Sequence, residues 1–317
     1  MKYCIGVDLG GTNIDVGLLE LESKRIVDKI SVKTNAPRPC EAISKDIADV
    51  CRRLCERAAI EMNELLWVGV ATPGIVKDAV VVAAYNLGWD NVPFGKILAD
   101  ELGVPTYVAN DANAAAYAEA KWGHGAGEES VIAVTLGTGV GGGIVFGGKI
   151  WEGINGFAAE VGHMMIDVGG RQCSCGLRGC FEAYCSATAL VAETKRVMKL
   201  YPESAMWQSV DGDLGRVNGV TAFAAKKQGD VAATIVVRDF IEHLAIGIAN
   251  LINVFQPSVV VVGGGISGEG EELMRPLRER LMHISFGTAN SRTKVEAAKF
   301  RNDAGIIGAG ILGLMEE

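Results

Sequence analysis

The chain contains two segments in which alternating apolar and polar residues reverse direction at glycines. Residues 3–19 predict a strand, a glycine turn and a returning strand, because alternate positions of a strand face opposite sides of a sheet. Residues 130–150 repeat this pattern. Aligned at a constant offset, the segments match at four positions, which predicts a duplicated unit and two related domains. The matching pairs are Ile5 and Ile132, Val7 and Val134, Leu9 and Leu136, and Gly10 and Gly137.

Helical spacing of apolar residues is clearest in residues 41–58. Apolar side chains three or four positions apart fall on one face of a helix. Cys51 and Cys55 lie on this face, so we predict that they are buried as small apolar residues. Further helices are predicted over residues 93–102, 111–122, 230–255, 271–281 and 304–315. Further strands are predicted over residues 66–70, 104–109, 259–262 and 294–298.

Strands and helices interleave along the whole chain, and this order predicts an α/β fold with mostly parallel sheets. The chain has no low-complexity linker between its halves. We place the most favourable domain boundary near Asp111.

The composition narrows the class of protein. The chain has 317 residues, 49% of them hydrophobic, and no uninterrupted apolar stretch long enough to predict a membrane span. Its formal net charge of −8 argues against general affinity for nucleic acid, which requires concentrated positive charge. The N-terminal residues show no targeting segment. We therefore expect a cytoplasmic protein.

Three glycine-rich loops follow apolar strands, and such loops let backbone N–H groups converge on phosphate oxygens. Thr12 and Thr138 would add hydroxyl donors, and Asp8 could hold Mg²⁺ through water. Each loop alone could instead be an ordinary β-turn. Gly263, Gly265 and Gly268 also fit a dinucleotide fingerprint, but too few residues follow for such a domain. The candidate nucleotide-binding residues are Asp8, Gly10, Gly11, Thr12, Asn13, Gly137, Thr138, Gly139, Gly263, Gly264 and Gly265.

One imidazole and three thiols gather in the segment from His163 to Cys180. The proposed ligands are His163, Cys173, Cys175 and Cys180. One nitrogen and three sulfur ligands suit tetrahedral Zn²⁺, and a site with four protein ligands is structural, not catalytic. The alternative is a chance cluster of reduced cysteines.

Several polar residues could bind a substrate. Asn110 and Asp111 stand where a strand meets a helix, so either could cap the helix and leave the other for chemistry. The carboxyl end of a strand is also where open α/β sheets place their active sites. Glu160 and His163 flank Gly162 at the start of the zinc segment, and Glu182 follows Cys180 by two residues, so the zinc would hold all three in one rigid neighbourhood suited to sugar hydroxyls.

At these residues the sequence resembles the ROK family of repressors and kinases, and within it the bacterial glucokinases. The motifs that carry the resemblance are DLGGTN at 8–13, ATPG at 71–74, NDAN at 110–113, LGTGVGGG at 136–143, EVGH at 160–163, CSCGLRGCFE at 173–182 and VVGGG at 261–265. The repressors of the family carry a DNA-binding segment before the first loop, and because seven residues precede Asp8 we do not expect that branch.

The resemblance implies an actin-like, hexokinase-type ATPase fold, related to ribonuclease H, with two α/β domains and a cleft between them. The expected domains are a small one, residues 1–110 with a C-terminal helix of about 304–317, and a large one, residues 111–303. Asp111 would be the catalytic base. The expected sugar contacts are Gly74, Asn110, Asp111, Glu160, His163 and Glu182. His163 would serve zinc with one ring nitrogen and sugar with the other.

We therefore expect an ATP- and Mg²⁺-dependent kinase acting on the 6-hydroxyl of a hexose, glucose first, with structural Zn²⁺. N-acetylmannosamine, N-acetylglucosamine, fructose, mannose or allose could replace glucose, and polyphosphate could replace ATP. A non-catalytic sugar sensor is the alternative from another class. The resemblance also implies a homodimer or homotetramer.

Overall fold

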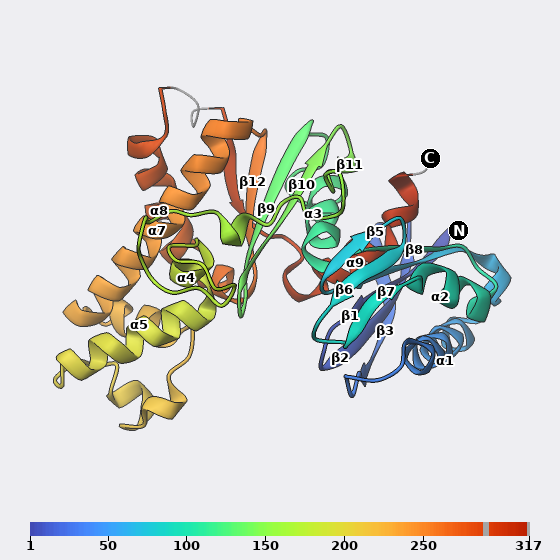
Figure 1. Ribbon diagram of the computed structural model, residues 1–317, viewed down its shortest axis with the longest axis horizontal. Coiled ribbons are helices and arrows are strands. Elements are labelled where there is room, and N and C mark those ends of the chain that lie inside the picture. The colour runs from blue at the N-terminus through green and yellow to red at the C-terminus, as the bar shows by residue number, and fades with distance from the viewer. Residues whose placement is uncertain (288–291, 316–317) are drawn as a thin grey trace. The chain divides into compact units, whose positions relative to one another are not determined.

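The structure is a computed structural model that describes residues 1–287 and 292–315 (Figure 1). The chain divides into two compact units: Met1–Val131 with Gly143–Ala159 and Asn302–Glu317, and Ile132–Gly142 with Glu160–Arg301. We call them unit 1 and unit 2. Compact units need not be folding domains, so the domain bounds that we predict from the sequence stay a prediction. Residues 316–317 of the predicted C-terminal helix lie outside the described residues.

The elements follow the predicted alternation. The strands are β1 Tyr3–Leu9, β2 Asn13–Glu20, β3 Arg25–Lys33, β4 Leu65–Thr72, β5 Ile75–Lys77, β6 Val80–Ala84, β7 Trp89–Val92, β8 Thr106–Asn110, β9 Ser130–Leu136, β10 Val140–Phe146, β11 Lys149–Ile150, β12 Val259–Gly263 and β13 Lys294–Ala297. The helices are α1 Cys40–Ala58, α2 Phe94–Leu102, α3 Asp111–Lys121, α4 Glu182–Cys185, α5 Ala187–Leu200, α6 Thr221–Lys227, α7 Val231–Phe255, α8 Glu271–Ile284 and α9 Ala304–Gly310.

The first sheet has the order β3-β2-β1-β4-β8. Its hairpin strands β1, β2 and β3 pair antiparallel, whereas β1–β4 and β4–β8 pair parallel. A second sheet has the order β11-β10-β9-β12-β13, and β5, β6 and β7 form a small antiparallel sheet. The prediction of mostly parallel sheets is therefore wrong in this respect. Each glycine turn returns the chain directly, and a short connection produces antiparallel strands.

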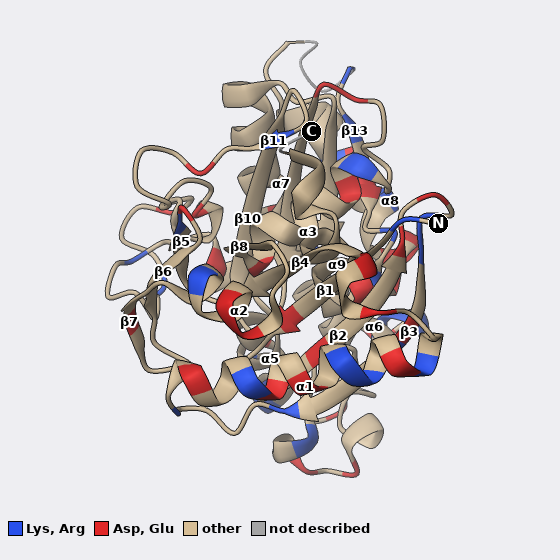
Figure 2. Ribbon diagram, turned by 90° about the vertical axis from the view of Figure 1, so that its right-hand side faces the viewer, with Lys and Arg blue, Asp and Glu red and all other residues tan. Residues whose placement is uncertain are grey.

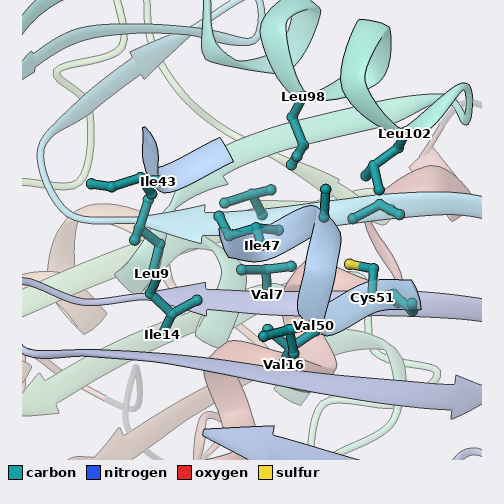
Figure 3. Packing of buried hydrophobic residues seen from close by; sticks show 14 of the residues in the cluster. Val7, Leu9, Ile14, Val16, Ile43, Ile47, Val50, Cys51, Leu98 and Leu102 are labelled. Atoms are coloured by element: carbon teal, nitrogen blue, oxygen red, sulfur yellow. The ribbon is translucent and has the colours of Figure 1, made fainter. Parts of the chain in front are cut away.

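The core of unit 1 confirms the predicted face of α1 (Figure 3). Ile43, Ile47 and Cys51 pack with the apolar residues of β1 and β2, and Cys55 is buried as well. Charged residues occupy other positions along α1 (Figure 2). Burial raises the pKa of the Cys55 thiol to about 11, which keeps it a neutral, apolar group.

Helix α9 closes unit 1 by direct contact with strand backbones. A Cβ atom on Gly6 would lie 1.9 Å from the carbonyl oxygen of Ile306, and one on Gly69 would lie 1.8 Å from that of Ala309. Only glycine permits this approach, which brings α9 onto β1 and β4. The predicted helix over 304–315 ends earlier, at Gly310, and continues as the 3₁₀ turn Leu312–Met315.

Unit 2 is built around the long helix α7, which contacts α4, α5, α6 and α8. Phe181 packs its ring against Gly247 of α7, where a Cβ atom would lie 2.4 Å from the ring. Among the described residues, none of the helices combines the length and the apolar character that crossing a membrane would require.

Candidate functional site

The first glycine loop connects β1 to β2 and contains Gly10, Gly11, Thr12 and, at the start of β2, Asn13. The loop closes on itself because the N–H of Gly10 donates to the carbonyl of Asn13 at 2.9 Å. Buried Thr34, which directly follows β3, holds the loop in place. The Thr34 hydroxyl donates to the Gly10 carbonyl at 2.6 Å, and its N–H donates to the Thr12 carbonyl at 3.0 Å. With these carbonyls occupied, the orientation of the loop peptides is set.

Asp8 lies next to this loop, near the end of β1. Burial, with smaller effects of the Asp111 and Asp15 carboxylates, raises the pKa of Asp8 from 3.8 to about 7. Unit 1 thus brings the predicted magnesium residue and the predicted catalytic base into electrostatic contact. Crowded carboxylates repel one another, and a divalent cation with its water ligands relieves this repulsion, so the residues present fit Mg²⁺.

The structure shows which residue caps α3. The Asn110 side chain accepts hydrogen bonds from the N–H groups of Ala112 and Asn113, at 2.9 and 3.2 Å. Its amide nitrogen donates to the Gly74 carbonyl at 2.9 Å, which brings two predicted sugar contacts together. The exposed carboxylate of Asp111 also accepts from the Ala112 N–H, at 2.8 Å, but the cap itself is Asn110. Asp111 is therefore not required as the cap.

The second glycine loop, Gly137 to Gly139, connects β9 to β10 in unit 2. It closes through a bond of 3.0 Å from the Gly137 N–H to the Gly139 carbonyl. The start of α5 holds it: the Ala187 N–H donates to the Gly137 carbonyl and the Thr188 hydroxyl to the Thr138 carbonyl, both at 2.8 Å.

The third glycine loop reaches the second one. Gly263 ends β12, and Gly264 has a φ of 83° with its Cα packed against Leu136. Gly265 begins the 3₁₀ turn Gly265–Glu269. A Cβ atom on Gly264 would lie 2.4 Å from the Leu136 carbonyl oxygen, so only glycine fits at this position. Two of the three predicted phosphate loops therefore lie together within unit 2.

The four predicted zinc ligands converge. The ligand atoms of His163, Cys173, Cys175 and Cys180 all lie within 4.8 Å of one another. The Cys175 and Cys180 sulfurs are 3.7 Å apart, and the Cys173 sulfur is 3.9 Å from His163 Nδ1. Ligands about 2.3 Å from a tetrahedral Zn²⁺ are separated by roughly 3.8 Å, so these atoms fit that ion.

The thiol environments differ within this cluster. A hydrogen bond from the backbone of Leu177 lowers the pKa of Cys175, whereas burial raises that of Cys180 to about 12. A zinc ligand must be a thiolate, so binding would release protons from the buried sulfur.

The segment before the cluster packs on the residue that follows the second glycine loop. A Cβ atom on Gly162 would lie 2.0 Å from the carbonyl oxygen of Val140. Gly162 stands between Glu160 and His163, whose side chains are exposed, in the turn Val161–His163. The Nδ1 atom of His163 faces the sulfur of Cys173, 3.9 Å away, so Nδ1 is the ring nitrogen on the side of the thiol cluster.

Glu182 begins α4 and contacts both neighbouring segments. Its Oε2 accepts from the Val140 N–H at 3.0 Å, and its Oε1 accepts from the Ser174 hydroxyl at 2.8 Å. A Cβ atom on Gly139 would lie 2.3 Å from Oε2. Unit 2 thus brings Glu182 to the second glycine loop and to the zinc segment at once.

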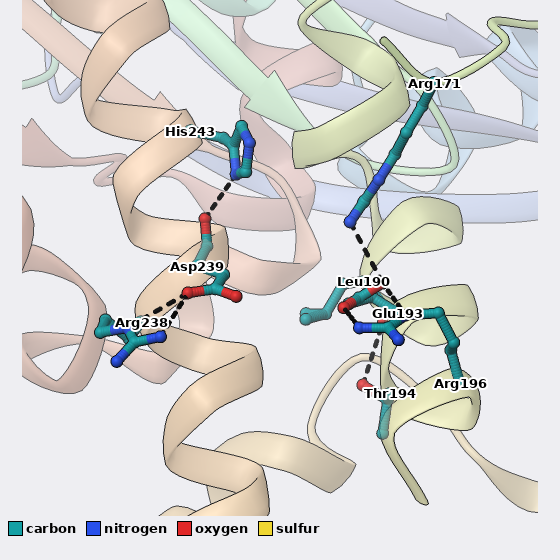
Figure 4. A network of polar contacts seen from close by, with 8 residues as sticks. All are labelled: Arg171, Leu190, Glu193, Thr194, Arg196, Arg238, Asp239 and His243. Carbon is teal, nitrogen blue, oxygen red and sulfur yellow. Dashed lines mark hydrogen bonds and ion pairs between the residues drawn. The ribbon is translucent and has the colours of Figure 1, made fainter. Parts of the chain in front are cut away.

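Sequence reasoning missed the residues that fix the zinc segment to the helices of unit 2. The Tyr184 hydroxyl donates to Asp167 at 2.6 Å and accepts from the Arg171 N–H at 2.8 Å. The Arg171 guanidinium lies over the Tyr184 ring, 4.7 Å from its centroid, and the His243 ring stacks on Tyr184 at 4.4 Å. Arg171 also pairs with Glu193 of α5 (Figure 4). In the sequence, the aromatic Tyr184, two positions after Glu182, was the one signal that could have indicated these contacts.

The fold and these loops show which class of protein this is. It is a mixed α/β protein with one glycine-turn hairpin in each of its two five-stranded sheets, as in the actin-like ATPase fold. The model of the ROK family matches residues 4–316. The chain belongs to the ROK family.

Similar proteins support this assignment over the full length. A glucokinase of Halalkalibacterium halodurans is 34% identical over 319 residues, which cover 100% of this chain and 96% of that protein. A glucokinase of Thermotoga maritima is 36% identical, with 96% and 95% covered. The crystal structure of a ROK family glucokinase from Streptomyces griseus, in complex with glucose and AMPPNP, is similar with a TM-score of 0.82 and 36% identity, covering 98% of both chains.

Proposed function

We propose that the protein transfers the γ-phosphate of ATP to the 6-hydroxyl of glucose, with Asp111 as general base. The kinship with glucokinases over nearly the whole chain supports the activity. The observation that carries the role of Asp111 is the cap of α3: Asn110 fulfils it, beside Gly74, and Asp111 stands next to it as an exposed carboxylate.

Each part of the site has a task in this reaction. Phosphoryl transfer requires alignment and charge stabilisation more than covalent chemistry. Asp111 would accept the proton of the attacking hydroxyl, a contribution of about 10²–10⁴ in rate for general bases. Bound Mg²⁺, held near Asp8, supplies positive charge to the β- and γ-phosphates. The N–H groups of Gly10 and Gly137 close their own loops, so the other N–H groups of the glycine loops would bind the phosphate oxygens, and Thr12 and Thr138 would add hydroxyl donors.

The residues that would bind the sugar hydroxyls are Gly74, Asn110, Glu160, His163 and Glu182. Carboxylates accept hydrogen bonds from hydroxyls, and the Asn110 amide and His163 Nε2 can donate or accept. The anchoring of Glu182 on two segments supports this role, because a preorganised acceptor loses less entropy on binding.

A structural Zn²⁺ on His163, Cys173, Cys175 and Cys180 is part of the proposal, and the convergence of the ligand atoms supports it. We expect one equivalent of zinc in purified protein. Cys175→Ser should lose the metal and weaken glucose binding, because Ser174 and His163 lie in the segment that the metal holds. Elemental analysis with glucose titration tests this. A Cys175→Ser protein with full metal content would exclude that ligand set.

The activity is tested by offering purified protein ATP and a panel of sugars and identifying the phosphorylated position. We expect glucose to have the highest kcat/KM and glucose 6-phosphate to be the product. Preference for N-acetylmannosamine, N-acetylglucosamine, fructose, mannose or allose would change the substrate. Turnover with polyphosphate alone would change the donor. Binding of glucose without ATP consumption would identify a sugar sensor.

Two further features belong to this proposal. Reduced cysteines as zinc ligands and ATP as donor both favour a cytoplasmic location. A homodimer or homotetramer follows from the family resemblance, and light scattering of the purified protein tests it.

A further inference from the structure

Val140 is a junction between the predicted sugar contacts and the second glycine loop. It directly follows Gly139, its N–H donates to Glu182 at 3.0 Å, and its carbonyl lies against Gly162, where a Cβ atom would be 2.0 Å away. On the other side, Gly139 approaches Glu182 so closely that a Cβ atom would lie 2.3 Å from Oε2. The second glycine loop and the proposed sugar contacts therefore pack in direct contact at this point.

Ser174 holds the other oxygen of Glu182. Its hydroxyl donates to Oε1 at 2.8 Å, and the Cys173 sulfur lies 3.7 Å from the same oxygen. A hydroxyl is a stronger donor than a thiol, so Ser174 is the main side-chain donor to this oxygen.

The two anchors leave Glu182 able to bind a substrate. A carboxylate has about four lone-pair sites, of which Val140 and Ser174 use one on each oxygen. The terminal torsion of a glutamate is broad, so an unanchored carboxylate would rotate among many orientations. Ser174 restricts this rotation, and in the orientation it favours Oε2 stays on the backbone of the nucleotide loop.

We propose that Ser174 is a positioning residue that locks Glu182 between the zinc segment and the second glycine loop, and that through this lock sugar and nucleotide strengthen each other's binding. The inference rests on the proposed function. A sugar hydroxyl on Glu182 adds a third bond to the anchored carboxylate and stabilises the loop position that binds phosphate. The same coupling acts in both directions, since binding linkage is reciprocal.

The first test measures the dissociation constant of glucose with and without saturating Mg²⁺ and AMPPNP. In the wild type we expect nucleotide to tighten glucose binding about fivefold or more, within the usual range of coupling. In Ser174→Ala this factor should fall below about twofold, and Ser174→Thr, which keeps the hydroxyl, should restore it. Ser209→Ala is the matched control, because its exposed hydroxyl donates to the Met206 carbonyl at 2.7 Å, outside the zinc segment and the glycine loops.

A Ser174→Ala protein with wild-type coupling and full zinc content overturns the proposal. A wild type that phosphorylates glucose but shows no coupling overturns it as well, while the proposed function stands. A wild type that neither binds nor phosphorylates glucose overturns the proposed function and the coupling with it.

The second test approaches the lock from the nucleotide side. Gly139→Ala should displace the Glu182 carboxylate, since the three atoms nearest to the added Cβ atom would all belong to Glu182. We expect glucose affinity, measured without nucleotide, to fall at least about fivefold. Gly219→Ala is the control, because the nearest atom to its Cβ would be 4.0 Å away. An unchanged glucose affinity in Gly139→Ala contradicts the proposal.

Discussion

The two glycine-turn hairpins share a backbone and differ in what surrounds the turn. Strands β1 and β9 each have 7 residues and the same succession of buried and half-buried positions. The sixth position is Asp8 in β1 and Thr135 in β9. A threonine hydroxyl donates to a loop carbonyl in both units, from Thr34 in one and Thr188 in the other. The two similar hairpins thus provide a glycine loop twice and a half-buried carboxylate once.

The largest difference in kcat is expected between substitutions at the sixth position of β1 and at the sixth position of β9. Asp8→Asn should lower kcat on the order of 10²-fold, because it removes the charge proposed to hold Mg²⁺ in a reaction that depends on electrostatic stabilisation. Thr135→Val, at the equivalent position, should change kcat by less than about threefold. Steady-state kinetics at saturating Mg²⁺ measures both. Equal losses of kcat in the two variants would show that Asp8 has no role in catalysis that Thr135 lacks.

The threonines that hold the loops should differ in stability. Thr34 is fully buried, so Thr34→Val leaves a loop carbonyl without its donor and should lower the free energy of unfolding by about 1–3 kcal/mol. Thr188 is exposed, and water can replace its hydroxyl, so Thr188→Val should cost less than about 1 kcal/mol. Urea denaturation compares the two. The reverse order would contradict the assigned burial of the first loop.

The smallest effect concerns pH. Because the pKa of Asp8 is raised from 3.8 to about 7, the folded protein retains a proton that the unfolded chain has released between these pH values. The unfolded state then binds fewer protons, so the free energy of unfolding should fall as pH rises through this window, without Mg²⁺. In Asp8→Asn this fall should be reduced. A stability profile that is the same in both proteins would show that Asp8 titrates normally.

Local patterns predicted much of the fold. The two hairpins, the buried face of α1 and the long helix α7 each follow from the periodicity of a continuous segment. The sheet of β5, β6 and β7 was not predicted, since strands of 3, 5 and 4 residues are too short to show a period.

The candidate site could likewise be predicted only where its residues are close in sequence. The zinc ligands are close in sequence, and their spacing was sufficient to predict that they converge. The bond between Val140 and Glu182 joins residues 42 positions apart, and the stack of Arg171, Tyr184 and His243 depends on how α4 and α7 pack. No local pattern encodes such pairs, because tertiary packing alone brings them together.

The central claim is that Asp111 removes the proton from the attacking hydroxyl of glucose. The most direct measurement is the rate of glucose 6-phosphate formation by Asp111→Asn at saturating ATP and glucose, with the glucose dissociation constant measured on the same protein. We predict a loss of about 10²–10⁴-fold in kcat with little change in glucose affinity. Near-normal turnover in Asp111→Asn would contradict the account.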